Sequence, residues 1–131
     1  MREIFDGSIP VSDDGYTQAV GEDDEVEEVP DLDKRVSAAP ILRFTLDYPF
    51  EREYHGQVVT DAGATLRQII DAIRAGFRAM YRGTTTEDIA NLENKRVRGD
   101  FGEAYHVIDD LVIEGISLDD ATGTLDISIG S

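Results

Sequence analysis

Alternating apolar and polar residues give the clearest strand signal in the chain, over residues 41–48. Leu42, Phe44 and Leu46 occupy every second position, and the residues between them are polar. A period of two is typical of a strand with one buried face. A weaker pattern predicts a second strand over 53–60. Because the link between the two is short, we expect them to pair as an antiparallel hairpin.

Helical spacing replaces this alternation over residues 66–82. The apolar positions of this segment are Leu66, Ile69, Ile70, Ile73, Phe77, Met80 and Tyr81. At 100° per residue they form a stripe about 120° wide. Thr65 and Gln68 have the spacing of a capping box, and Gly83 follows where a left-handed C-terminal residue is expected. The pattern predicts an amphipathic helix over 66–82.

Small residues occupy one flank of this predicted helix. They are Ala72, Ala75, Gly76 and Ala79. Glycine inside a helix costs about 1 kcal/mol relative to alanine, so its presence indicates tight packing at that point. We expect a second, shorter helix over 87–97, capped by residues 84–86, to pack there. A contact between molecules is the alternative.

Two further strands are predicted over 111–118 and 124–129, joined by a turn that contains Asp and Gly. The order is therefore hairpin, helix, short helix, hairpin. It predicts an α+β fold, ββα(α)ββ, in which a four-stranded, mainly antiparallel sheet packs on one long helix. This order is compatible with a β-grasp or ubiquitin-like arrangement, where a hairpin precedes the main helix. No family motif accompanies it.

Residues 1–39 differ from the rest of the chain in composition. They hold 12 Asp or Glu and three Lys or Arg, so they contribute −9 to a total formal charge of −16. Six of the acids fall within residues 22–28. Such a run repels itself and has little apolar area to bury. We therefore expect a mostly disordered acidic N-terminal arm over 1–39 and a single domain over 40–131.

One short apolar patch interrupts this acidic arm, at Ile4, Phe5 and Ile9. We interpret it as part of a frayed terminus. Docking of the patch onto the domain or onto a partner is the alternative interpretation.

The strong negative charge argues against general affinity for nucleic acid or anionic membranes, because phosphates would be repelled. Three explanations of the acidity compete: solubility, adaptation to high salt, and mimicry of nucleic acid by carboxylates. The chain has no cysteine, no apolar run long enough to cross a bilayer, and no signal-peptide pattern at its start. We expect a soluble, cytoplasmic protein without a cofactor.

A strip of arginines lies beside the apolar stripe of the long helix. This arginine strip consists of Arg67, Arg74, Arg78 and Arg82, and it falls within about 80° of arc together with Asp71. One interpretation is structural, since Asp71 can pair with its neighbours and arginine stems can cover the edge of the core. The other is recognition of an anion, either an acidic partner or the protein's own acidic arm.

A second basic group follows the predicted short helix. This basic cluster consists of Lys95, Arg96 and Arg98. Together with the arginine strip it could form one positive patch on an acidic body, and a solvated loop is the alternative. We predict that the strip and the cluster bind a partner.

The two histidines, His55 and His106, are the only side chains that suggest metal chemistry. Acids lie close to each in the sequence, but the spacings match no established ligand pattern. A metal-dependent site at these two histidines is therefore a minor hypothesis. We expect surface histidines and no bound metal.

The leading hypothesis is a non-catalytic protein–protein interaction module. Its working surface would combine the arginine strip with an exposed sheet edge, because such edges accept a partner strand. The partner would be a protein, with an acidic surface as one option, and self-association is the other. The alternative is a nucleic-acid-mimicking inhibitor or accessory protein of a virus or mobile element. No serine lies in a nucleophile-elbow context, and we expect no enzymatic activity.

Overall fold

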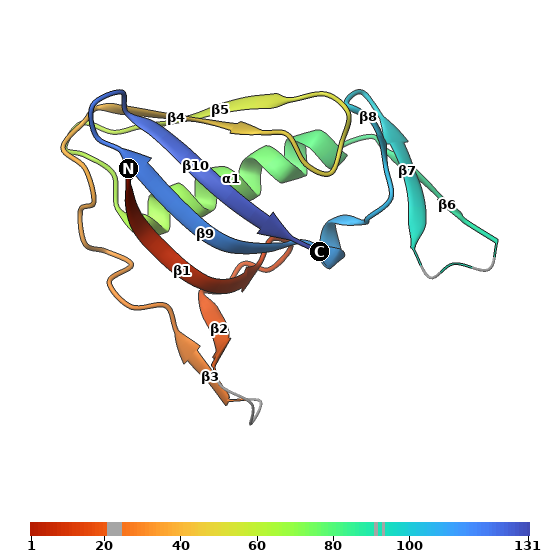
Figure 1. Ribbon diagram of the computed structural model, residues 1–131, viewed down its shortest axis with the longest axis horizontal. Coiled ribbons are helices and arrows are strands. Elements are labelled where there is room, and N and C mark those ends of the chain that lie inside the picture. Colours follow the sequence, from red (N-terminus) through yellow and green to blue (C-terminus); the bar gives the residue numbers. More distant parts are fainter. Residues whose placement is uncertain (21–24, 91, 93) are drawn as a thin grey trace.

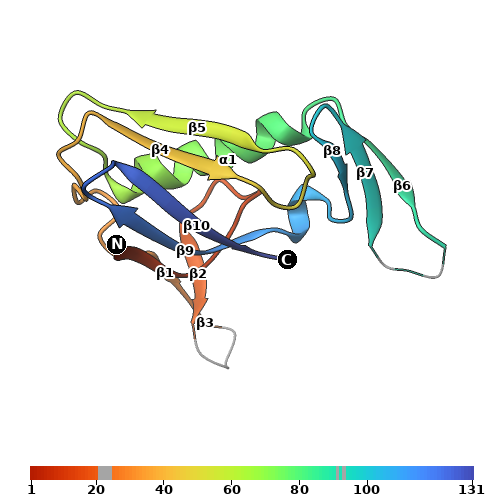
Figure 2. The same ribbon diagram turned by 45° about the horizontal axis from the view of Figure 1, so that its top comes forward.

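A computed structural model describes residues 1–20, 25–90, 92 and 94–131. A twisted five-stranded sheet forms the body, and an α-helix lies across one of its faces (Figures 1 and 2). Two smaller sheets stand at the margins of this body in both views. One extends away from the N-terminal strand, and the other lies beyond the C-terminal end of the helix.

The main sheet has the strand order β1-β9-β10-β4-β5. Its strands are β1 (Arg2–Pro10), β9 (Val112–Asp119), β10 (Thr124–Gly130), β4 (Ile41–Leu46) and β5 (Tyr54–Val59). Neighbouring strands run antiparallel, except that β10 and β4 are parallel and meet at Thr124 and Arg43. The sheet is therefore mixed, with β1 and β5 as its outer strands.

The two smaller sheets are antiparallel, and one outer strand of each is exposed along its whole length. One consists of β2 (Thr17–Val20) and β3 (Glu25–Glu28), and the other of β6 (Thr85–Asp88), β7 (Lys95–Gly99) and β8 (Gly102–Ala104). A 3-10 turn, η1 (Ile108–Asp110), leads from β8 back to the main sheet. Few apolar residues of the small sheets are buried. In the β6-β7-β8 sheet they are Val97 and Ala104.

The predicted long helix is confirmed as α1 (Leu66–Tyr81). Its capping box is also confirmed, since Thr65 Oγ1 accepts a hydrogen bond from the Gln68 amide at 3.2 Å and Gln68 Oε1 accepts from the Thr65 amide at 2.9 Å. These two bonds satisfy donors that would otherwise be unpaired at the start of the helix. Gly83 has φ +70°, the left-handed conformation expected just after the helix.

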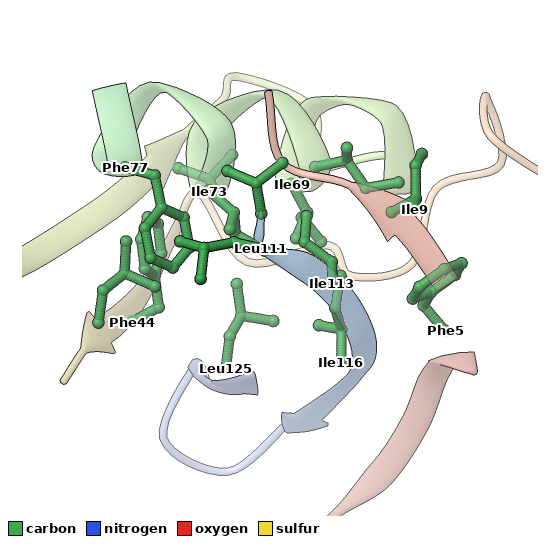
Figure 3. Close-up of a cluster of buried hydrophobic side chains, with 14 of the residues drawn as sticks. Phe5, Ile9, Phe44, Ile69, Ile73, Phe77, Leu111, Ile113, Ile116 and Leu125 are labelled. Carbon is green, nitrogen blue, oxygen red and sulfur yellow. The ribbon is translucent and has the colours of Figure 1, made fainter. Parts of the chain in front are cut away.

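The core lies between α1 and the main sheet (Figure 3). Ile69, Ile73 and Phe77 of the helix are fully buried. They face apolar side chains of β4, β9 and β10 and of the residue just before β9. These side chains are Phe44, Leu111, Ile113, Ile116 and Leu125. The N-terminal residues Phe5 and Ile9 belong to the same cluster. The first strand is thus part of the core.

The expected fold class is wrong. The main sheet has five strands rather than four and includes a parallel pair, so the ββα(α)ββ, β-grasp-like description does not hold. The expected disordered arm is also wrong, because residues 1–20 are ordered and β1 pairs with β9. The physical reason is apolar burial: Phe5, Ile9 and Val11 are at most 5% exposed. The interpretation of the apolar patch at Ile4, Phe5 and Ile9 as a frayed terminus is therefore wrong too.

The acidic run expected at 22–28 is only partly described. Residues 22–24 lie outside the described residues, while Glu25, Glu27 and Glu28 belong to β3 and pair with β2. The side chains of Glu25, Glu27 and Glu28 are exposed. A two-stranded hairpin therefore accommodates acids by pointing them into water.

The expected short helix over 87–97 is wrong as well. Residues 85–88 and 95–99 form the facing strands β6 and β7, in register from Thr85 with Arg98 to Asp88 with Lys95. Over the described residues, the small flank of α1 therefore has no second helix to pack against. At Gly76, an added Cβ would lie 2.9 Å from side-chain atoms of both Leu46 and Tyr54. The close approach that this glycine permits is to the sheet.

A second glycine fixes the packing of the outer strand β5. Gly56 is the cross-strand partner of Phe44, and a Cβ at Gly56 would lie 2.3 Å from the Phe44 ring. The ring therefore covers the glycine, as aromatic side chains often do for glycines in edge strands. This contact leaves no room for a side chain on the inner face of β5 at this point.

Candidate functional site

Three members of the arginine strip, Arg67, Arg74 and Arg78, contact the N-terminal part of the chain. Arg67 donates two hydrogen bonds to the carboxylate of Asp33, at 2.8 and 3.2 Å, and its guanidinium lies 4.6 Å from the centre of the Tyr16 ring. The hydrogen bond from Arg67 lowers the pKa of Asp33. The Tyr16 hydroxyl in turn donates to Asp71 of the helix. Both partners of Arg67 lie within the segment that was expected to be disordered.

Arg74 is the most deeply placed member of the arginine strip, with 1% of its surface exposed. Its Nε and Nη2 both donate to the carbonyl oxygen of Pro10, at 3.2 and 2.8 Å. Burial lowers the pKa of this guanidinium. Arg74 therefore anchors the end of β1 to the helix, which is a structural use of the charge.

The remaining members of the arginine strip lie further along α1. Arg78 forms an ion pair with Asp14 at 3.2 Å, again with the N-terminal segment. Arg82 is exposed and is the C-cap residue of the helix. Of the two predicted uses of the strip, the contacts of Arg67, Arg74 and Arg78 match binding to the protein's own N-terminal part.

The basic cluster is paired across the strands of the second small sheet. Lys95 contacts Asp88, Arg96 lies 3.1 Å from Glu87, and Arg98 lies 2.7 Å from Glu103. These pairs join residues that face each other or are close neighbours in the register. Each cation of this cluster therefore contacts a carboxylate of its own sheet and does not form a free positive patch.

The histidines have separate surroundings. His55 on β5 has its Nδ1 3.2 Å from Thr45 Oγ1 and its Nε2 3.5 Å from Glu53. His106 contacts Asp110 through Nδ1 at 3.4 Å and Ser131 through Nε2 at 3.3 Å. Among the residues that the structure describes, no group of three or more His, Cys, Asp or Glu side chains could hold a metal ion.

The outer strand β5 presents a regular, uncovered backbone edge. The Thr60 amide donates to the Pro40 carbonyl at 2.9 Å, so alternate residues of β5 point their backbone toward β4. The backbone groups of His55, Gln57 and Val59 consequently point away from the sheet. Their side chains are exposed, and Val59 keeps 62% of its surface. Over the described ranges, only β4 pairs with this strand.

A shallow depression lies beside this edge on the face of the sheet away from α1. It has a volume of about 390 Å³ and is lined by Arg43, Phe44, Thr45, His55, Gly56, Gln57 and Thr124. It combines one cation with hydroxyl, amide and imidazole groups. Such a surface can hold a polar side chain of a strand placed next to β5.

The opposite outer strand, β1, is protected. Its register with β9 shifts twice, between Glu3 and Phe5 and between Asp6 and Ile9. The Ser8 amide is 3.4 Å from the side-chain oxygen of Gln18 on β2, so the neighbouring hairpin covers part of the edge. A cavity of about 450 Å³ remains between β1, β3 and residues 30–36. Irregular pairing and a covering segment are the usual means of blocking a sheet edge.

No family model, no curated protein and no solved structure matches the chain. Over the described residues, no helix is both long and apolar enough to span a bilayer. The function therefore has to be argued from the geometry of the surface. The sequence predicted an exposed sheet edge without saying which one. The absence of Pro and Lys from residues 54–59 is the signal that could have identified β5.

Proposed function

We propose that the protein is an interaction module that binds an extended segment of a partner protein, which adds to the main sheet as a further strand beside β5. The observation that carries this proposal is the contrast between a blocked edge at β1 and an open edge at β5. Main-chain hydrogen bonds from His55, Gln57 and Val59 would supply affinity. The depression beside the edge would supply selectivity for alternate side chains.

The partner segment carries positive charge in this proposal. The protein has a formal charge of −16. Most cations that were expected to attract an acidic partner are already paired, as the contacts of Arg67, Arg78 and Arg96 illustrate. An acidic segment would meet the field of the whole molecule, whereas a basic one would be drawn toward it. This replaces the acidic partner expected from the sequence with a basic one.

The test uses the full chain and displayed libraries of extended 12-residue peptides, one rich in Lys and Arg and one rich in Asp and Glu. We expect the basic library to give binders and the acidic library to give none at physiological salt. Binding should slow amide hydrogen exchange at His55, Gln57 and Val59, because their N–H groups become hydrogen-bonded. Amides of Gly56 and Val58, which face β4, should change little.

Two substitutions at one position provide the matched control. Gln57→Pro removes an outward N–H and should weaken peptide binding about 10-fold or more, while Gln57→Ala keeps the N–H and should bind nearly as well. Equal binding by both variants, or exchange protection elsewhere with none at β5, would contradict strand addition. Stronger selection from the acidic library would contradict only the charge of the partner.

A further inference from the structure

Four polar side chains form a continuous hydrogen-bonded chain near the end of β10. The hydroxyl of Tyr48 is 2.7 Å from Ser131 Oγ, which is 3.3 Å from His106 Nε2. On the other side of the imidazole, Nδ1 is 3.4 Å from Asp110 Oδ2. We refer to these four side chains as the relay. None of them belongs to the β5 edge or to the arginine strip.

One arrangement of protons satisfies every contact in the relay. Tyr48 donates to Ser131, Ser131 donates to His106 Nε2, and His106 Nδ1–H donates to Asp110. A hydroxyl, an imidazole and a carboxylate in this order are the elements of an activated serine nucleophile. Contacts of this length are common in nucleophilic sites without substrate and shorten when one binds.

The imidazole is held in place by its surroundings. Asp110 belongs to η1 and lies one turn after His106, and the side chain of His106 is 23% exposed. The hydroxyl of Tyr81 on α1 donates to the His106 backbone carbonyl at 2.7 Å. The backbone of His106 is therefore tied to the main helix independently of its side chain, whereas Ser131 is exposed and accessible to a substrate.

A small cavity of mixed polarity adjoins the relay. Its volume is about 240 Å³, and it is lined by Thr45, Leu46, Asp47, Tyr48, Phe77, Ile127 and Ile129. Tyr48 belongs to both the relay and the cavity wall, and Ile129 of β10 lies two residues before Ser131. The volume is below the roughly 300–1,000 Å³ of sites for drug-sized ligands, so an acyl chain that enters beside the apolar wall must be short.

We infer that Ser131 is a nucleophile toward short-chain carboxylic esters, with His106 as its general base and Asp110 as the residue that positions the imidazole. Ser131 Oγ forms a bond to the ester carbonyl carbon while its proton moves to His106 Nε2. The bond from that carbon to the alcohol oxygen then breaks, and the alcohol leaves with the proton from Nε2. Water, deprotonated by His106, releases the carboxylic acid and restores the Ser131 hydroxyl.

The geometry limits this chemistry to esters with good leaving groups. Tyr48 supplies one hydroxyl donor next to Ser131, whereas efficient acyl transfer uses several donors aimed at the developing oxyanion. The removal of one such donor typically costs about 100-fold or more in rate. We therefore expect hydrolysis of activated short esters and no hydrolysis of the corresponding amides.

The experiment combines covalent labelling with a rate measurement on the full chain. Diisopropyl fluorophosphate should phosphorylate Ser131 with release of fluoride, as located by mass spectrometry of peptides. The protein should hydrolyse p-nitrophenyl acetate and butyrate but not the matching anilides. Ser131→Ala should abolish the label and reduce ester hydrolysis to that of the unfolded protein, and His106→Gln should lower the rate about 100-fold or more.

Two control substitutions separate this proposal from ordinary surface reactivity. Ser128→Ala removes an exposed serine of β10, and Asp109→Asn removes an exposed carboxylate next to Asp110 in the sequence. Both should leave labelling and hydrolysis unchanged. A loss of activity in Asp109→Asn as large as in His106→Gln, or a label distributed over several serines, would overturn the assignment.

The positioning role of Asp110 has its own readout. Asp110→Asn should lower the rate of ester hydrolysis with little change in KM, because the substrate does not touch this side chain. Asp110→Glu should restore part of the rate, since a carboxylate can again accept from Nδ1–H. If Asp110→Asn hydrolyses the esters as fast as the natural chain, then Asp110 does not position the imidazole.

Discussion

Strands β1 and β5 are both outermost in the main sheet, yet among the described residues only β1 has a further hairpin against its edge. The pairing of β1 is irregular at two places, and the hairpin that follows it lies against its edge. β5 pairs with β4 over six residues without a shift and leaves its outward backbone groups free. The difference indicates that the chain blocks one edge and keeps the other available for a partner strand.

The two outer strands also differ in how much apolar side-chain surface they bury in the core. β1 contributes Phe5 and Ile9, which are 5% and 0% exposed, whereas the exposed side chains of β5 include Val59 at 62%. A strand that holds the core together is a poor place for exchange with a partner. The outer strand that contributes less to the core can bind without risk to the fold.

The largest expected contrast is in stability. Ile9→Ala should lower the free energy of unfolding by about 2–5 kcal/mol, because it leaves a cavity in the core. Val59→Ala should change it by about 0.5 kcal/mol or less, because the side chain is exposed. Denaturant unfolding of the two variants checks both values. Similar losses in both would show that β5 is as deeply integrated as β1.

A second contrast concerns how β1 is attached to α1. Arg74→Ala should cost about 3 kcal/mol, since it removes two charge-assisted hydrogen bonds to the Pro10 carbonyl and leaves that acceptor unpaired. Arg78→Ala removes an exposed ion pair and should cost about 0–1 kcal/mol. Thermal or urea unfolding distinguishes the two. An equally small effect at both positions would argue against the anchoring role of Arg74.

Neighbouring prolines test the direction in which the β5 backbone points. Val58→Pro removes an N–H that bonds to β4 and should cost about 1–3 kcal/mol through the unpaired carbonyl alone. Gln57→Pro removes an N–H that faces water and should cost less. Unfolding of the two variants by urea gives the comparison. The reverse order would mean that the assigned outward face of β5 is incorrect.

Lowering the pH should reduce the local stability around β1 before that of β4 and β5. The effect on the stability of the whole protein should be small. Hydrogen bonds from Arg67 and Arg2 lower the pKa of Asp33 and Asp120 in the folded protein. A lowered pKa stabilises the fold above the ordinary value of about 3.9, and this contribution is lost as the pH falls through the folded values. Both pairs tie the N-terminal part to the rest of the chain.

The measurement is amide hydrogen exchange between about pH 4 and pH 2. Amides of β1 and of residues 31–36 should lose protection at a higher pH than those in the β4–β5 ladder. A double variant, Asp33→Asn with Asp120→Asn, should already show this loss at neutral pH and little further change in acid. Simultaneous loss in both regions of the natural chain would contradict the expected order.

The local patterns of the sequence predicted several elements well. The alternation of Leu42, Phe44 and Leu46 and the capping box at Thr65 depend on neighbouring residues alone, and both are confirmed. The arginine strip was predicted beside the apolar stripe of this helix, and its member Arg74 is buried. Its contacts could not be predicted, because Asp33 and Asp14 lie far away in the sequence and come close only through the path of the N-terminal chain.

The errors have a common physical cause. In β1 the buried Phe5 and Ile9 are an even number of residues apart and share one face, but Gly7 lies between them, so the apolar alternation is weak in the sequence. The density of acids in residues 1–39 therefore led to a prediction of disorder, although the few apolar residues there stabilise an ordered strand once they are buried. The threonines at residues 84–86 suggested a helix cap, yet Thr85 and Thr86 begin a strand whose partner carries the arginines of the basic cluster.

The site was predicted only in outline. An exposed edge was expected as part of the binding surface, and β5 fits that description. The relay could be detected only in part, since His106 and Asp110 are four residues apart but Ser131 is distant from both in the sequence. Side chains that meet through tertiary structure leave no spacing signal in a single chain.

The aromatic ring of Phe44 resting on Gly56 gives this fold a recognisable pair of positions. Any larger residue at 56 would have to displace the ring, and a smaller residue at 44 would open a hole beneath the outermost strand. The two positions should therefore vary together in any chain that adopts this architecture. Such a coupled substitution pattern offers a way to find distant relatives whose overall sequences have diverged beyond direct comparison.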